Sequence, residues 1–254
     1  MNHVLDKLNE IQQGRIGINV YCTENTAFLP SINTEMTVPL ASAAKIAIGY
    51  CAAARVEEGE FNWNDIVDNI SFNPSEDSKE VYPHFQIRSS LQLSEAVEVM
   101  IACHDSLVAA EVVKYCGGWE EVNHTIQAEF PSIQVTDNPR SHENKGKLDE
   151  ALHLMIHIYE EYTKNPDIWT PVINGLVRQK GEIEGIPSSH LNHMTGGLEN
   201  VVVDIGIMGA FGEHPLLFAL GAVDLPNRFN DETADQKIIE AMKLLYHEYT
   251  NLLG

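Results

Sequence analysis

Residues 38–54 read VPLASAAKIAIGYCAAA, and this stretch decides how the rest of the chain is interpreted. From Ala41 to Ala54 the residues are small or apolar all round a helix, and Lys45 carries the only charge. A helix without a polar face is a buried helix. Ser42 lies three residues before Lys45, so the two side chains share one face of that helix. A lone lysine in apolar surroundings needs a chemical reason to be there.

Catalysis supplies such a reason. Desolvation lowers the pKa of a buried lysine and favours the neutral amine, which can take the proton from the Ser42 hydroxyl. The backbone N–H groups of a helix N-terminus can also stabilise an oxyanion. We therefore predict Ser42 as a nucleophile and Lys45 as its base. The Ser-x-x-Lys spacing also arises by chance, so the apolar surroundings carry more weight than the spacing itself.

Composition places the chain among globular proteins and excludes several partners. The 254 residues are 44% hydrophobic and 21% charged, which predicts a sizeable core. A net charge of −21 argues against nucleic acid or an anionic membrane as partner. No apolar run is long enough to cross a bilayer. The polar start, MNHVLDKLNEIQQGRIG, is not typical of a secretory signal, and with the initiating Met it favours a cytoplasmic location.

Cysteine and histidine usage gives no sign of a metal site. The four cysteines lack Cys-x-x-Cys spacing and lie in apolar segments, which favours reduced, buried thiols over a disulfide. The eleven histidines are scattered along the chain without a ligand motif. We expect neither a metal nor another cofactor.

The hydrophobic pattern predicts an α+β fold in α/β/α layers. Residues 15–25 and 26–33 form a predicted hairpin, and 190–197, 201–210 and 215–225 are β-rich runs typical of an antiparallel meander. A first helix ending by Gly14 and a last helix over 231–254 would flank this antiparallel sheet. The predicted organisation is one domain, 1–254, with a sheet lobe from 1–40 and 185–254 and an all-helical lobe from 41–184.

Three segments together resemble the class A β-lactamase and penicillin-binding-protein superfamily. They are VPLASAAKIAIGYCAA, LQLSEAVEVMIACHDSLVAAEVV (91–113) and LVRQKGEIEGIPSSHLNHMTGGLENVVVDIGIM (176–208), in the order of that family's Ser-x-x-Lys, Ser-Asp-Asn and Lys-Thr-Gly motifs. The resemblance covers nearly the whole chain. It implies a mixed sheet beside an all-helical lobe, with the site between them.

Two of the three motifs depart from the family. The second triplet reads His104-Asp105-Ser106, so an imidazole replaces the family's proton-shuttling hydroxyl; His104 can still relay a proton, and Ser106 is an alternative. The third triplet has Met194 in place of the family's second lysine, which helps to bind a substrate carboxylate. Loss of that cation also removes about 3 kcal/mol of repulsion at ~5 Å, which favours a neutral Lys45.

The loop over 135–146, VTDNPRSHENKG, is shorter than the family's loop, whose glutamate releases the acyl-enzyme. Glu143 is the predicted counterpart and Asp137 another candidate, although a solvated carboxylate is the more common role for a loop residue. Tyr82 matches an aromatic at the family's cleft mouth, with simple packing as the alternative.

The predicted catalytic and substrate-binding residues lead to two functional hypotheses. The catalytic residues are Ser42, Lys45, His104, Ser106 and Glu143, and the substrate-binding residues are Thr195, Gly196, Gly197 and Tyr82. The first hypothesis is a serine hydrolase that acts through an acyl-enzyme on a small β-lactam, amide or ester, with Thr195, Gly197 and Ser42 around the oxyanion. The second is a catalytically decayed protein that keeps the fold for binding or as a scaffold.

Overall fold

A five-stranded antiparallel sheet forms the centre of the protein in the computed structural model, which describes residues 1–252. Its strand order is β2-β1-β9-β8-β7, so the first hairpin joins the last three strands as predicted. Strand β7 therefore lies at one edge of the sheet. The strands are β1 (Arg15–Cys22), β2 (Ala27–Phe28), β7 (Leu191–Leu198), β8 (Val201–Met208) and β9 (Leu216–Val223).

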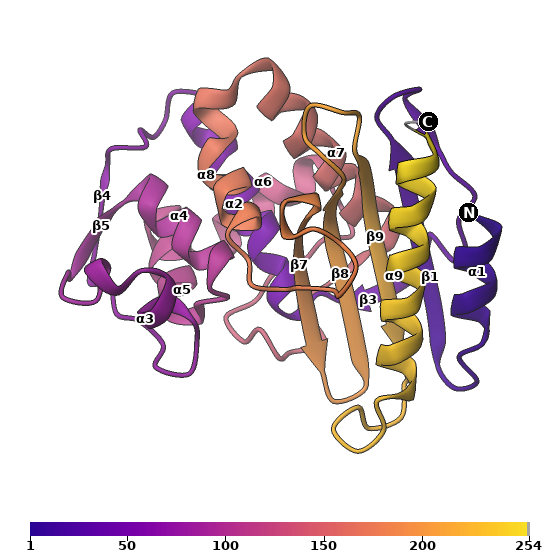
Figure 1. The fold of residues 1–254 in the computed structure, drawn as a ribbon. Helices are drawn as coiled ribbons and strands as arrows, with labels where there is room; N and C mark the ends of the chain where they lie inside the picture. Colours follow the sequence, from indigo (N-terminus) through magenta and orange to yellow (C-terminus); the bar gives the residue numbers. More distant parts are fainter. Residues whose placement is uncertain (253–254) are drawn as a thin grey trace.

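The two terminal helices cover one face of the sheet (Figure 1). Helix α1 (Asn2–Asn9) lies beside α9 (Thr233–Leu252), and both pack on apolar side chains of the sheet such as Ile18 and Phe218. The opposite face, with Val203 and Ile205, belongs to the larger core that the middle of the chain completes. Because both faces are covered, β8 and β9 are buried along their whole length, which explains their nearly unbroken apolar sequences.

The middle of the chain is mostly helical, and α2 runs through it as a buried helix that packs against α4, α5, α6 and α8. Helix α7 also contacts β1 and β9, so it covers the second face of the sheet. The helices are α2 (Ala44–Glu57), α3 (Ser78–Val81), α4 (Leu93–Ala102), α5 (Ser106–Tyr115), α6 (Trp119–Glu129), α7 (Leu148–Lys164) and α8 (Pro166–Val177).

Two small strand pairs and three short 3₁₀ turns complete the structure. Strand β3 pairs with β6, which places the loop before β6 next to the segment that enters α2; β4 pairs with β5. The strands are β3 (Thr37–Pro39), β4 (Ile66–Asp68), β5 (Ser90–Gln92) and β6 (Lys145–Lys147). The turns are η1 (Ala41–Ala43), η2 (Pro83–Phe85) and η3 (Ser188–His190).

The predicted fold class is confirmed, and the differences lie in short elements. The sequence predicts a loop over 135–146, where the structure begins β6 at Lys145, and it does not predict the short elements β4 and α3. These pieces are too short for a periodic pattern to reveal them. Residues 253–254 of the predicted last helix lie outside the described residues. Among residues 1–252, no helix combines the length and apolar character needed to cross a membrane.

Candidate active site

Ser42 lies in the tight turn η1, just before α2, and is partly exposed. The preceding residue, Ala41, has a φ of 47°, which is uncommon for a residue with a Cβ. The loop that ends at Asn144 holds this strained backbone: Leu40 N donates to Asn144 O over 2.7 Å, and Asn144 Nδ2 donates to Ala41 O over 2.9 Å. Strain kept in place by a surrounding network is common at functional sites.

Lys45 is buried, with 3% of its surface exposed, in the first turn of α2. Burial lowers the pKa of Lys45 to about 8, against the opposing effect of the Glu76 and Asp105 carboxylates. About a tenth of the amine is therefore neutral at pH 7, against less than a thousandth for a lysine with its ordinary pKa of 10.5. The helical turn from Ser42 to Lys45 places the two side chains on one face, as the sequence predicts.

Helix α5 places Ser106 in a pocket that Lys45 also lines. Asp105 caps the helix by accepting hydrogen bonds from Leu107 N and Val108 N, over 3.0 and 3.2 Å. The other oxygen of Asp105 accepts from Asn73 N over 3.0 Å, and Asn73 Nδ2 donates to Ser106 Oγ over 3.2 Å. Ser106 thereby turns inward and lines a small pocket together with Lys45.

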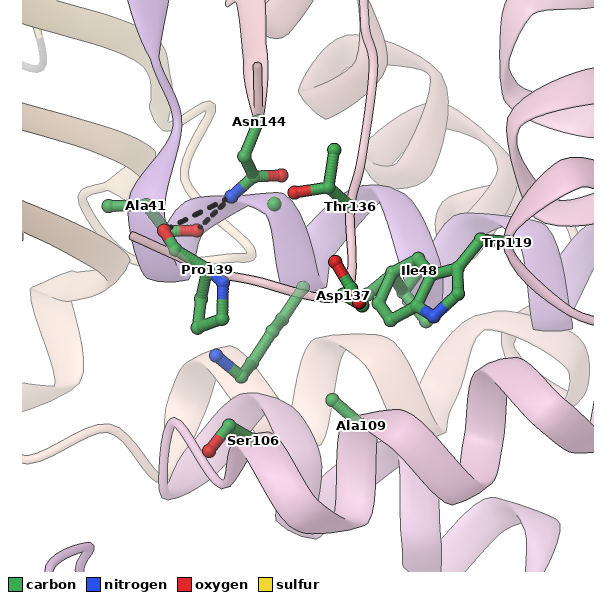
Figure 2. Close-up of a pocket in the computed structure, with 11 residues that line it drawn as sticks. Ala41, Ile48, Ser106, Ala109, Trp119, Thr136, Asp137, Pro139 and Asn144 are labelled. Carbon is green, nitrogen blue, oxygen red and sulfur yellow. Dashed lines mark hydrogen bonds between the residues drawn. The ribbon is translucent and has the colours of Figure 1, made fainter. Parts of the chain in front are cut away.

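This pocket has a cavity volume of about 20 Å³, which suits a single water molecule. Its walls come from α2, α5, the start of α6 and the loop over 136–144; Figure 2 shows Asp137 and Pro139 of that loop across from Ser106. Asn144 is 1% exposed, and its Oδ1 has no hydrogen-bond partner among the described residues. A buried oxygen without a partner needs a donor such as water.

His104 connects α4 to α5 with a φ of 55°. Its Nε2 lies 2.6 Å from Gln179 Oε1. Burial lowers the pKa of His104, the hydrogen bond with Gln179 opposes that effect, and the charge of Lys45 lowers the pKa further. The imidazole is therefore a neutral group, held close enough to Lys45 for the lysine charge to lower its pKa.

Strand β7 packs against the Ser42 turn with Gly196. A Cβ on Gly196 would overlap the Leu40 carbonyl oxygen, so only glycine allows this approach. Gly197, the next residue, is exposed on this edge strand. Met194, at the position of the family's second lysine, is fully buried in the larger core, so an uncharged thioether lies there instead of an ammonium group.

Thr195 and His193 lie on the other side of β7. Thr195 Oγ1 donates to Asp204 Oδ1 over 3.3 Å, and His193 Nδ1 lies 2.7 Å from the same oxygen. The second ring nitrogen of His193 lies 3.1 Å from the Gly181 carbonyl. Burial alone would lower the pKa of His193, but the Asp204 charge and these hydrogen bonds raise it. With an acceptor at each nitrogen, His193 is an imidazolium.

Two predicted site residues lie elsewhere. Tyr82 is 2% exposed, stacks on Phe85 and donates from its hydroxyl to Glu98 over 2.8 Å, so it is a packing residue and not part of a cleft mouth. Glu143 is exposed and pairs with Lys145 over 2.8 Å, and it does not line the pocket that Asp137 lines. Of the two loop carboxylates considered from the sequence, the structure brings Asp137 to Lys45.

Four further residues at the site were not predicted from the sequence: Asn73, Glu76, Asn144 and Gln179. Asn73 positions Ser106, and Gln179 positions His104. Glu76 acts on Lys45 through its charge, and its own pKa is raised by burial. The Asn-Pro-Ser turn signal at 73–75 marks a loop, but it does not tell which helix that loop contacts.

Comparisons with known proteins show which folds this chain is similar to. Two solved structures of PBP-A, one of them a mutant in its acyl-enzyme complex with penicillin G, superpose with a TM-score of 0.81 at 17% identity; for that mutant, 98% of this chain and 96% of the other are covered. An ancestral class A β-lactamase gives 0.76 at 16% identity over 97% and 98% of the two chains. A β-lactamase from Xanthomonas campestris pv. campestris gives 0.76 at 14% identity over 95% and 97%.

These structural likenesses show the fold. No curated protein matches the sequence. The sequence model of the β-lactamase enzyme family matches residues 2–249, almost the whole length. The predicted family resemblance is thereby confirmed, and this chain belongs to the β-lactamase enzyme family.

Proposed function

We propose that this protein is a serine hydrolase in which Ser42 attacks the carbonyl of a β-lactam, amide or ester and forms an acyl-enzyme. One observation carries the proposal: Lys45, a helical turn from Ser42, is 3% exposed, and burial lowers its pKa to about 8. A neutral amine beside a hydroxyl is the general base that a serine nucleophile needs. A core lysine without such a task would only weaken the fold.

The proton lost by Ser42 has a short route to the leaving group. Lys45 takes it from Ser42 Oγ, and either His104 or Ser106 passes one proton on to the leaving nitrogen or oxygen. At the end of acylation the carbonyl carbon is bonded to Ser42 Oγ, the bond to the leaving group is broken, and Lys45 is neutral again. The proposed donors to the oxyanion are exposed backbone N–H groups on the edge strand β7 and the backbone N–H of Ser42.

Release of the acyl group requires a water molecule, for which the pocket beside Lys45 has the right size. Asn144 Oδ1 accepts one hydrogen bond from this water, and the Asp137 carboxylate takes its proton. Asp137 replaces Glu143 in this proposal because Asp137 lines the pocket, whereas Glu143 does not line it and pairs with Lys145.

The substrate is expected to lack a carboxylate near β7. Met194 is buried and uncharged, and Thr195 donates to Asp204, so an anionic group would meet a carboxylate there. Arg228 is already bound to Asp235 by two contacts of 2.8 and 3.0 Å. A neutral ester should therefore be preferred over the matching anionic acyl donor, which competition between the two can measure.

A decayed enzyme with a binding role is the second candidate. It is favoured by the pocket itself, which has a volume of only about 20 Å³ and whose walls include Lys45 and Ser106 but not Ser42. A protein of this kind would keep the fold without reacting at Ser42.

Intact-mass spectrometry separates these candidates. The full chain is treated with penicillin G, with a neutral activated ester and with a fluorophosphonate, and Ser42→Ala is the matched control. A hydrolase gives an adduct on Ser42 with at least one probe and none in Ser42→Ala. Absence of any adduct from all three probes, in a folded protein, would support the decayed enzyme.

A further inference from the structure

The side chain of Gln179 joins two groups of the helical region. Gln179 follows the end of α8, and its Nε2 donates to the carbonyl oxygen of Ile101, near the end of α4. Its Oε1 lies 2.6 Å from His104 Nε2. Gln179 thus bonds both to the helix that precedes His104 and to the His104 ring itself.

These contacts fix which way the amide points. A backbone carbonyl only accepts hydrogen bonds, so the NH₂ group of Gln179 must face Ile101 and the oxygen must face His104. An acceptor opposite Nε2 requires a hydrogen on Nε2. Because burial keeps His104 neutral, the imidazole carries only one N–H, and Nδ1 holds the free lone pair.

The two residues that follow Gln179 are also anchored. Lys180 Nζ lies 2.6 Å from Glu80, and the Gly181 carbonyl accepts from the His193 imidazolium over 3.1 Å. Gln179 is therefore held in place before any substrate arrives. Preorganised partners of this kind set the tautomer and the orientation of functional histidines.

We propose that Gln179 is a positioning residue that holds His104 as the Nε2–H tautomer, so that Nδ1 is the atom that relays the proton. This inference rests on the proposed function for its chemical meaning. Nδ1 takes a proton from the Lys45 ammonium and passes it to the leaving group, while Nε2–H stays bonded to Gln179. Both Lys45 and His104 end the step in the protonation state in which they began.

The tautomer can be measured without any turnover. In full-length protein labelled with ¹⁵N-histidine, long-range ¹H–¹⁵N correlation spectra show which ring nitrogen of His104 carries hydrogen, and His104→Gln assigns the signal. The expected result is Nε2–H in the parent protein and loss of that preference in Gln179→Leu. Gln86→Leu is the matched control, because within residues 1–252 the Gln86 amide bonds only the backbone carbonyls of Ser78 and Tyr82.

Acylation kinetics supply a second readout. A positioned acid–base group contributes ~10²–10⁴-fold, so Gln179→Leu should slow acylation at saturating probe by at least roughly tenfold with little change in the half-saturating concentration. Gln179→Glu keeps an acceptor opposite Nε2 of His104 but adds a negative charge. This charge should shift the pH profile of acylation to higher pH. The other charges acting on His104 are those of Lys45 on α2, Asp77 before α3 and His193 on β7, and they are unchanged in both variants.

An Nδ1–H tautomer in the parent protein, or an Nε2–H tautomer that persists unchanged in Gln179→Leu, would overturn the inference. Failure of the proposed function would give a different experimental result from failure of this inference. In that case Ser42 is not acylated in the parent protein, whatever tautomer its spectrum shows.

Discussion

Replacing Lys45 by methionine should stabilise the protein at neutral pH, although it removes the proposed base. Lys45 is 3% exposed, and its pKa falls from 10.5 to about 8 in the folded protein. One pKa unit corresponds to about 1.36 kcal/mol. The cost of holding the charged amine in the core at pH 7 is therefore about 3 kcal/mol, and Lys45→Met removes it.

The gain in stability from Lys45→Met should depend on pH. Below pH 8 Lys45 is protonated in both the folded and the unfolded parent protein, so the free-energy cost of burying its charge is fully present. Between pH 8 and 10.5 the unfolded chain binds more protons than the folded one, so the parent protein becomes more stable relative to the variant. Above pH 10.5 the amine is neutral in both states, and only the better packing of methionine remains.

Urea unfolding of the parent protein and Lys45→Met at pH 7 and pH 10 measures this difference. The free energy of unfolding of Lys45→Met should exceed that of the parent protein by about 3 kcal/mol at pH 7 and by clearly less at pH 10. Lys114→Met is the matched control, because the Lys114 side chain is 68% exposed and, among the described residues, pairs only with Glu111 on the surface. A Lys45→Met variant that is less stable at pH 7, or a gap that is the same at both pH values, would refute the reasoning.

Three further predictions test other parts of the site. Gly196→Ala should slow acylation and lower stability, because its Cβ would push β7 away from the Ser42 turn; Gly212→Ala, where the Cβ meets open space, should change neither. Asp137→Asn should let the acyl-enzyme accumulate in mass spectra, whereas Glu143→Gln should release it at the parent rate. The raised pKa of His193 adds stability that is fully present below pH 6.5 and is lost as pH rises through the folded pKa. Urea unfolding of His193→Gln between pH 5 and 9 should lack this dependence.

The fold could be predicted because the sequence signals agree at several levels. The apolar helix after Ser42 needs a shell of other helices around it, and the long β-rich runs near the end, such as 201–208, need cover on both faces. Helix α7 lies within the predicted all-helical lobe, but its contact with β1 and β9 was not predicted. Periodicity shows that one face of a helix is apolar and leaves open which partner that face meets.

The candidate site was predicted where it follows from spacing along one element. Ser42 and Lys45 lie three residues apart in one helical segment. Gly196 was predicted only from the resemblance to the family's third motif, and its close approach to the Leu40 carbonyl was not predicted. Gln179 and Asn144 could not be found in this way, because each acts through a side chain that bonds a segment far away in sequence. Tyr82 was misplaced for a related reason: exposure of an aromatic depends on partners such as Glu98 that no local pattern reveals.

The pH dependence of Ser42 acylation tests the central claim most directly. The rate of adduct formation, measured by rapid-quench intact-mass spectrometry with a neutral ester, should rise with pH and reach half its maximum near pH 8, where Lys45 loses its proton. A rate that stays level from pH 6 to pH 10, or that is unchanged in Lys45→Met, would contradict a nucleophile activated by this buried amine.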